Sequence, residues 1–221
     1  MMETLLLLLQ ILLINIVLSG DNAVVIALAS KKLPEEQRKK AVWWGATGAV
    51  LLRIVLTFAA VLLLDVPYIQ VAGGILLLYI AVKLMLDDGG HSDVKAAPGL
   101  WSAVWTIIVA DFVMSLDNVL AVAAIAKDNV LVLILGIVLS IPLIIWGSHI
   151  IMRLLSRYPV LNYLGAGILG FAAGEMIIAD QAMIHFMEGR SPSLHWLFPV
   201  GFPIIVIASG LMKKLLAPRA I

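Results

Sequence analysis

Long apolar stretches alternate with short polar segments along the whole chain. A helix needs about 20 mostly apolar residues to cross the hydrocarbon core of a bilayer. Seven stretches meet this requirement, each bounded by charged residues, glycine or proline. They predict seven transmembrane helices: Leu5–Ser30, Ala41–Leu64, Tyr68–Leu86, Leu100–Ala126, Val130–Met152, Val160–Ala179 and Trp196–Leu216. The connections are too short to fold alone, so we expect residues 1–221 to form a single transmembrane domain.

Composition supports this interpretation and excludes others. Of 221 residues, 62% are hydrophobic and 13% are charged, whereas soluble domains are about 45–50% apolar and about 25% charged. The chain has no cysteine, which argues against a disulfide-stabilised secreted module. The predicted fold class is an all-α polytopic membrane protein.

The basic residues predict how the chain is oriented in the cell membrane. With the N-terminus outside, twelve of the 15 Lys and Arg residues fall on the inner side, and only Lys127 and Arg190 fall outside. Cytoplasmic loops are enriched in Lys and Arg, so we expect an outer N-terminus and a cytoplasmic C-terminus. A six-span alternative would omit Trp196–Leu216 and place Lys213 and Lys214 outside.

The first and fourth stretches resemble each other. A shift of 96 residues places Asn15–Asn22 over Asp111–Asn118, and Ser19/Ser115, Asp21/Asp117 and Asn22/Asn118 are among the identities. We therefore predict two repeats, 5–86 and 100–179, with 196–216 as an extra helix. Because each repeat holds three spans, the second enters the membrane from the opposite side, as in many secondary transporters.

Several polar residues lie where membrane helices normally avoid them. An ionised carboxylate inside the bilayer must be paired, hydrated or bound to a cation. Carboxylate, amide and hydroxyl oxygens suit magnesium, calcium or manganese(II). The candidate ligands are Asp21, Asn22, Asp111, Asp117 and Asn118, and the candidate supporting residues are Asn15, Ser19, Ser115, Arg53 and Glu175.

A structural interpretation of the same residues is that they join helices through hydrogen bonds and ion pairs. Arg53 is better explained as a counter-ion for one of the aspartates than as a ligand of the substrate. For Glu175, structural pairing and a pathway role are equally open.

The inverted repeats also predict which side chains meet. Antiparallel docking would bring Asp111 level with Asp21, and Asn15 level with Asp117. Helical periodicity places Asn15, Ser19 and Asn22 on one face, and Asp111, Ser115 and Asn118 on the corresponding face. Gly20 favours a local break in the first span.

Other function classes lack their signatures. The sequence contains no nucleophile elbow, P-loop or H-E-x-x-H motif, so we expect no enzyme activity and no ATP-driven pumping by this chain. The basic run Lys31–Lys40 is an orientation signal between spans rather than a nucleic-acid site.

The motifs S-G-D-N-A-V-V-I-A-L-A (Ser19–Ala29) and D-F-V-M-S-L-D-N-V-L-A-V (Asp111–Val122) resemble the TerC family of integral membrane proteins, in particular its short bacterial branch labelled YjbE-like. This family is grouped with the LysE-type exporters. The resemblance implies manganese(II) efflux, metal delivery to exported enzymes, or a role in membrane biogenesis. It also implies that Asp21, Asn22, Asp117 and Asn118 are the family's signature positions.

These observations lead to one main hypothesis and two alternatives. The chain would be a secondary transporter that exports a divalent cation, with manganese(II) favoured over calcium and magnesium, by exchange with protons and without a resident cofactor. The alternatives are an exporter of a small organic solute or oxyanion, and a non-transporting partner for assembly or metallation of other membrane proteins. Gly45, Gly48 and the run 165–174 permit close helix contact, either within one chain or in a homo-oligomer.

Overall fold

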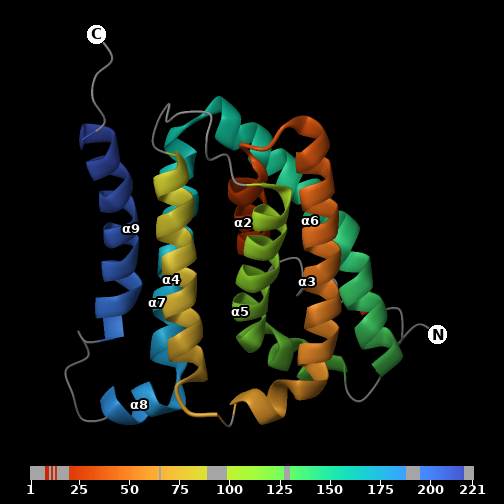
Figure 1. Ribbon diagram of the computed structural model, residues 1–221. Coiled ribbons are helices and arrows are strands. Elements are labelled where there is room, and N and C mark those ends of the chain that lie inside the picture. The colour runs from red at the N-terminus through yellow and green to blue at the C-terminus, as the bar shows by residue number, and fades with distance from the viewer. Residues whose placement is uncertain are drawn as a thin grey trace. The chain divides into compact units, whose positions relative to one another are not determined.

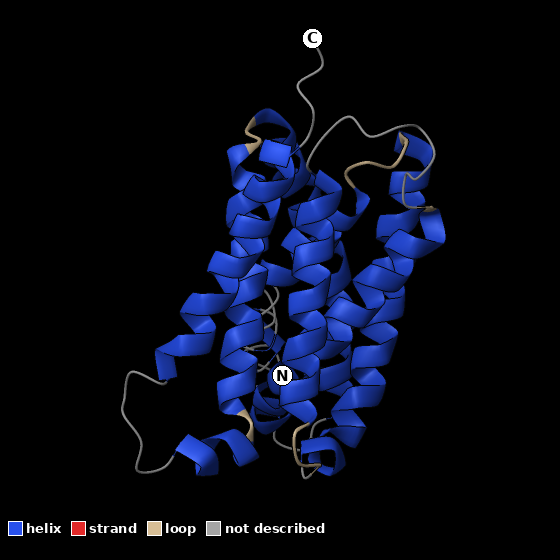
Figure 2. Ribbon diagram, turned by 60° about the vertical axis from the view of Figure 1, so that its left-hand side comes forward, coloured by secondary structure: helices blue, strands red, loops and turns tan. Residues whose placement is uncertain are grey.

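The computed structural model describes residues 8, 9, 11, 13, 20–64, 66–88, 99–126, 130–187 and 195–216. Throughout this part, the chain forms helices joined by turns and contains no strand (Figure 2). The predicted all-helical fold class is therefore confirmed.

Except for the short α8, each described helix overlaps one of the predicted apolar stretches, and Figure 1 shows their arrangement within the chain. They are α2 (Gly20–Ser30), α3 (Glu35–Leu64), α4 (Ile69–Asp88), α5 (Leu100–Ala126), α6 (Val130–Arg157), α7 (Val160–Ala179), α8 (Gln181–Met187) and α9 (Leu197–Leu216).

Five of these helices, namely α3, α4, α6, α7 and α9, are long and apolar enough to cross a membrane. Two shorter apolar segments, Gly20–Ser30 and Leu100–Leu116, lie within the first and fourth predicted spans. The protein is thus a multi-pass membrane protein. The total of seven spans stays a prediction, because most of residues 1–19 lie outside the described part.

Helix α8 was not predicted. The sequence analysis treated the residues between Ala179 and Trp196 as a connection without secondary structure, but Gln181–Met187 forms a short helix directly after α7. Its seven residues are too few for a periodic apolar pattern to stand out against the neighbouring spans.

Proline marks the start of several helices. Pro34 precedes α3 and accepts a hydrogen bond from the Arg38 amide at 2.8 Å, and Pro159 stands at the N-cap of α7. Proline fits the first turn of a helix because its missing N–H would have no partner there. Pro67 lies in the turn before α4, where Tyr68 adopts a positive φ of 63°.

The helices form two compact units. Unit 1 (Met1–Asp65 and Pro98–Arg153) contains α2, α3, α5 and most of α6. Unit 2 (Val66–Ala97 and Leu154–Ile221) contains α4, α7, α8, α9 and the end of α6. The units do not coincide with the predicted repeats, because each unit takes helices from both repeats.

In unit 1, α5 packs closely against α3. Gly45 and Gly48 of α3 face Ile107 and Ile108 of α5, and a Cβ atom on either glycine would come within 3 Å of the facing isoleucine side chain. Small residues of this kind let membrane helices approach each other and gain dispersion energy. This close contact fixes the position of α3 along the axis of α5. It therefore also fixes the position of Arg53, which lies two turns further along α3.

In unit 2, α7 packs against both α4 and α9, and the three helices lie side by side in Figure 1. A Cβ on Gly74 of α4 would lie 2.6 Å from the carbonyl oxygen of Ala173, and one on Gly174 of α7 would lie 2.5 Å from the backbone at Phe198 and Pro199. The glycines of α7 thus serve contacts within one chain.

Asp180 connects three elements of unit 2. Its side chain is almost fully buried at the end of α7. One carboxylate oxygen accepts the backbone N–H groups of Gln70 and Val71 at 3.2 and 3.4 Å, and the other accepts that of Ala182 at 2.9 Å. A single acid therefore caps the N-termini of α4 and α8, whose first N–H groups lack partners within their own helices.

Replacing Gly174 with alanine should destabilise unit 2, because the added methyl group would meet backbone atoms that cannot move aside. We expect a loss of about 1–3 kcal/mol, measured as a lower unfolding temperature in detergent. Gly201→Ala is the matched control, since no atom lies within 4 Å of a Cβ at that position. Equal unfolding temperatures for the two variants would contradict the close packing of α7 against α9.

Candidate functional site

A group of buried polar side chains lies in the middle of unit 1. Asn22 of α2, Arg53 of α3, and Asp111 and Ser115 of α5 are each at most 7% exposed. Residues of this kind are costly to bury without partners. Their hydrogen bonds therefore decide whether the cluster is stable.

Asp111 is at the centre of this cluster. Its Oδ1 atom accepts a hydrogen bond from Asn22 Nδ2 at 2.6 Å and an ion-pair contact from Arg53 Nη2 at 2.7 Å. Its Oδ2 atom accepts a hydrogen bond from Ser115 Oγ at 3.2 Å. Arg53 also donates from Nε to Ser115 Oγ at 2.9 Å. The predicted role of Arg53 as a counter-ion thus agrees with the observed geometry, and Asp111 is its partner.

The geometry follows from the directions of the helices. Asp111 and Ser115 are four residues apart on α5 and so share a face. Helix α2 runs antiparallel to α5, since Asn22 contacts Asp111 whereas Leu33, just after α2, clusters with Ala103 and Val104. The expected antiparallel docking of these two helices is therefore observed within unit 1.

Asp21 lies beside this cluster and is partly exposed. Its carboxylate accepts the backbone N–H of Asn22 at 2.9 Å in the first turn of α2, where a negative charge complements the helix dipole. The charges of both Asp111 and Arg53 act on it. The direct partner of Asp111 on α2 is Asn22, whereas the sequence analysis expected Asp111 to lie level with Asp21.

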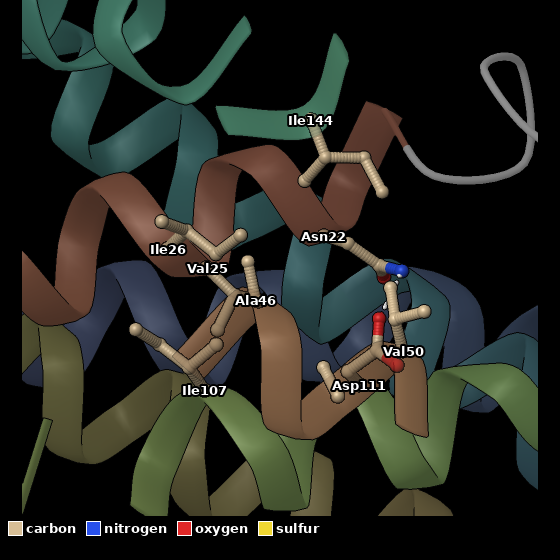
Figure 3. A pocket seen from close by; sticks show the side chains of 9 residues that line it. Asn22, Val25, Ile26, Ala46, Val50, Ile107, Asp111 and Ile144 are labelled. Atoms are coloured by element: carbon tan, nitrogen blue, oxygen red, sulfur yellow. Dashed lines mark hydrogen bonds between the residues drawn. The ribbon is translucent and has the colours of Figure 1, made fainter. Parts of the chain in front are cut away.

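A small cavity of about 10 Å3 adjoins these residues. Of the described residues that line it, Asn22 and Asp111 are polar and the other seven are apolar (Figure 3). The volume corresponds to roughly one water-sized particle. Figure 3 shows the Asn22 side chain directed toward the Asp111 carboxylate, with the hydrogen bond between them.

Among the described residues, one atom of the cluster has no hydrogen-bond partner. Asn22 Oδ1 is buried and accepts no hydrogen bond from any residue that the structure describes. Leaving such an acceptor unsatisfied costs about 1–3 kcal/mol. An acceptor of this kind beside a carboxylate and a cavity is suited to a cation or to a hydrogen-bond donor.

The other predicted site residues are distributed differently. Asn118 is partly exposed one turn beyond Ser115 on α5. Asn15, Ser19 and the side chain of Asp117 lie outside the described residues. Glu175 is exposed on α7 in unit 2, so the structure does not bring it into this cluster. Among the described side chains, no three His, Cys, Asp or Glu residues gather around one point.

The sequence analysis missed Asp180, because it treated this residue as part of a polar loop. An aspartate directly before a short helical segment is a typical N-cap signal, and this pattern could have identified α8. Its second role at the start of α4 could not be derived, since that contact joins residues 110 positions apart.

The fold and this cluster define an integral, multi-pass helical membrane protein with a buried ion pair inside one helical unit. The chain belongs to the TerC family of integral membrane proteins, whose family model matches residues 1–217. This family is associated with transport.

A relative supports this assignment. The chain is 43% identical over 159 residues to the uncharacterized membrane protein YjbE of Bacillus subtilis (strain 168), and the match covers 71% of this chain and 73% of YjbE. No solved structure matches the chain.

Breaking the ion pair on one side should destabilise the protein more than removing it from both sides. We expect Arg53→Gln or Asp111→Asn alone to cost about 3–5 kcal/mol, because each leaves one buried charge unpaired. The double variant should recover much of this loss. Unfolding of all three in the same detergent tests the coupling, and a double variant that loses the sum of the two single losses would contradict it.

Proposed function

We propose that this protein is a secondary transporter that exports a divalent metal cation across the cell membrane. Manganese(II) is the favoured cargo, with calcium and magnesium as alternatives, and protons are the proposed exchange ion. The chain would act as a transporter and not as an enzyme, and it would need no resident cofactor. With this mechanism, the protein would belong to the superfamily of LysE-type exporters.

The observation that carries this proposal is that Asn22 Oδ1 has no partner among the described residues. This oxygen is buried, Nδ2 of the same amide donates to the Asp111 carboxylate, and both residues line the same small cavity. Amide and carboxylate oxygens are the ligands that hard divalent cations prefer. A cation at this position would give the amide oxygen the partner that it lacks.

Asp21 completes the ligand set that we propose. It follows Gly20 at the start of α2, and its carboxylate interacts electrostatically with Asp111 and Arg53. Two carboxylates balance the charge of one divalent cation, and Asn22 adds a neutral oxygen. Asp117 and Asn118 are proposed as further ligands from their equivalent positions in the second repeat.

The state of Arg53 favours a cation over an anionic cargo. An exporter of oxyanions or acidic organic solutes would need a positive charge that is available to its substrate. Arg53 lies near the middle of a predicted span, and its guanidinium is already paired with Asp111 at 2.7 Å. The cluster therefore presents oxygen atoms more readily than positive charge.

The proposed transporter contains two inverted repeats, and two equivalent contacts support this arrangement. Ile11 and Ile107 correspond under the shift of 96 residues. Ile107 packs on Gly45 of α3, and Ile11 packs on Gly136 of α6. Each isoleucine thus meets a glycine in the second span of the other repeat, as a two-fold relation between the repeats requires.

The proposed orientation places the N-terminus outside and the C-terminus in the cytoplasm. Exposed tryptophans near the starts of α3 and α5 mark the membrane interface, and the basic residues before them on α3 support this orientation: Trp43, Trp44, Trp101 and Trp105 are each at least 60% exposed. Tryptophan is enriched at the membrane interface, and lysine and arginine are enriched in cytoplasmic loops. On α3 the two features adjoin, because Arg38–Lys40 directly precede this aromatic group.

Manganese(II) uptake into proteoliposomes, with and without a pH gradient, tests this function. We expect flux that increases with the gradient in the wild type and falls at least about tenfold in Asp21→Asn and Asp117→Asn, because each loses a ligand charge. Thermal unfolding should show that both variants remain folded. Gradient-dependent flux that persists in both variants would exclude these carboxylates from the pathway.

Glu175→Gln is the matched control for this experiment. It also removes a carboxylate from a predicted span, but Glu175 is exposed and lies in unit 2. We expect its flux to equal that of the wild type. Loss of flux in Glu175→Gln to the same extent as in Asp21→Asn would contradict the assignment of the site to unit 1. If the folded wild type transports none of manganese, calcium or magnesium, the transport proposal fails.

A further inference from the structure

The Asp111 carboxylate is already occupied by hydrogen-bond donors. Oδ1 receives both Asn22 Nδ2 and Arg53 Nη2, and Oδ2 receives Ser115 Oγ. A metal ion binds carboxylate lone pairs, which are the sites that these donors use. Because two donors share Oδ1, a divalent cation can bind this oxygen, the one next to Asn22, only if one of these two donors moves away.

Arg53 is the donor whose charge conflicts with the cargo. A guanidinium that stayed at 2.7 Å from Asp111 Oδ1 would stand directly beside a divalent cation bound to the same oxygen. Repulsion between two cations in a buried site is screened far less than in water. The ion and the guanidinium therefore exclude each other electrostatically.

Arg53 has a second contact that does not depend on the carboxylate. Its Nε atom donates to Ser115 Oγ at 2.9 Å, one helical turn along α5 from Asp111. The guanidinium can thus lose its Nη2 contact with Asp111 and still retain a hydrogen bond. This second contact keeps Arg53 close to the site when the ion is present.

Asn22 has two orientations that match these two states. As observed, Nδ2 donates to Asp111 and Oδ1 has no partner among the described residues. A half-turn of the amide about its Cβ–Cγ bond would instead place Oδ1 beside Asp111. Two oxygens repel each other unless a cation lies between them, so the flipped amide fits the loaded site and the observed amide fits the resting one.

We propose that the guanidinium of Arg53 is a tethered cation, which occupies Asp111 when no cargo is bound and is displaced when a divalent cation binds. This inference rests on the proposed function and adds how the same site releases one divalent cation and binds the next. The Asp111 carboxylate is never left without a positive partner, because Arg53 returns to it when the ion leaves. Arg53 is thus a positioning residue that competes with the cargo and is not a ligand of it.

Manganese(II) binding to the detergent-purified protein, measured by titration calorimetry at one pH, tests the competition. Removing the competing charge in Arg53→Gln should lower the Kd for manganese(II) at least about tenfold. Arg53→Lys keeps the charge but loses the planar guanidinium that contacts Asp111 and Ser115 together, so its Kd should lie between those of Arg53→Gln and the wild type. A purely structural role for Arg53 predicts the opposite order, with the tightest binding in the wild type.

Arg153→Gln is the matched control, because it removes one positive charge from an exposed position on α6. Its Kd should equal that of the wild type. A Kd that falls as far as in Arg53→Gln would show a general effect of net charge and would overturn the proposal.

The buried carboxylate in Arg53→Gln has lost its partner, so this variant can fail to fold. In that case, the comparison of Arg53→Lys with the wild type decides: a lower Kd supports the competition, and an equal or higher Kd overturns it. If the wild type binds none of manganese, calcium and magnesium, the proposed function fails as a whole. A wild type that binds manganese(II) more tightly than both folded Arg53 variants overturns only the competition.

Discussion

A charge buried within a bundle of apolar helices must be accompanied by an opposite charge, and the pair Arg53–Asp111 meets this requirement in unit 1. Both side chains are almost completely buried and lie 2.7 Å apart. The pair joins α3 to α5, while the hydrogen bond from Asn22 joins α2 to the same carboxylate. The three helices must therefore keep a common height, which the close contacts of Gly45 and Gly48 with α5 also impose. Electrostatics and packing specify the same arrangement.

Unit 2 is assembled differently, although it too uses glycine for close approach. Its helices α4, α7 and α9 meet along glycines that face backbone atoms, and the buried acid Asp180 binds backbone N–H groups and not a basic side chain. The described charged cluster thus belongs to one unit, whereas the other consists mainly of tightly packed apolar helices.

Much of this arrangement could be predicted from local sequence patterns. The apolar stretches predict the long helices because hydrophobic length is decided within about 20 residues. Helical periodicity correctly places Asp111 and Ser115 on one face of α5, but it did not identify Asn22 as the partner of Asp111. The candidate partners of Arg53 could be limited to the aspartates of the spans, because a basic residue near the middle of a membrane helix needs an acidic partner. Sequence alone could not show that Asp180 caps α4, or that Glu175 is exposed on α7 in unit 2, since both depend on which helices pack together.

The pairs that satisfy the buried polar groups also connect distant parts of the chain. Arg53 and Asp111 are 58 residues apart, Asn22 and Asp111 are 89 apart, and Gln70 and Asp180 are 110 apart. At a synthesis rate of about 5–20 residues per second, Asp111 leaves the ribosome roughly 3–12 s after Arg53. During that interval the nascent chain carries a guanidinium whose aspartate has not yet been made. The first half of the chain therefore cannot complete its own polar contacts. During biosynthesis, Arg53 has to stay in contact with water, lipid headgroups or the insertion machinery until α5 has been made.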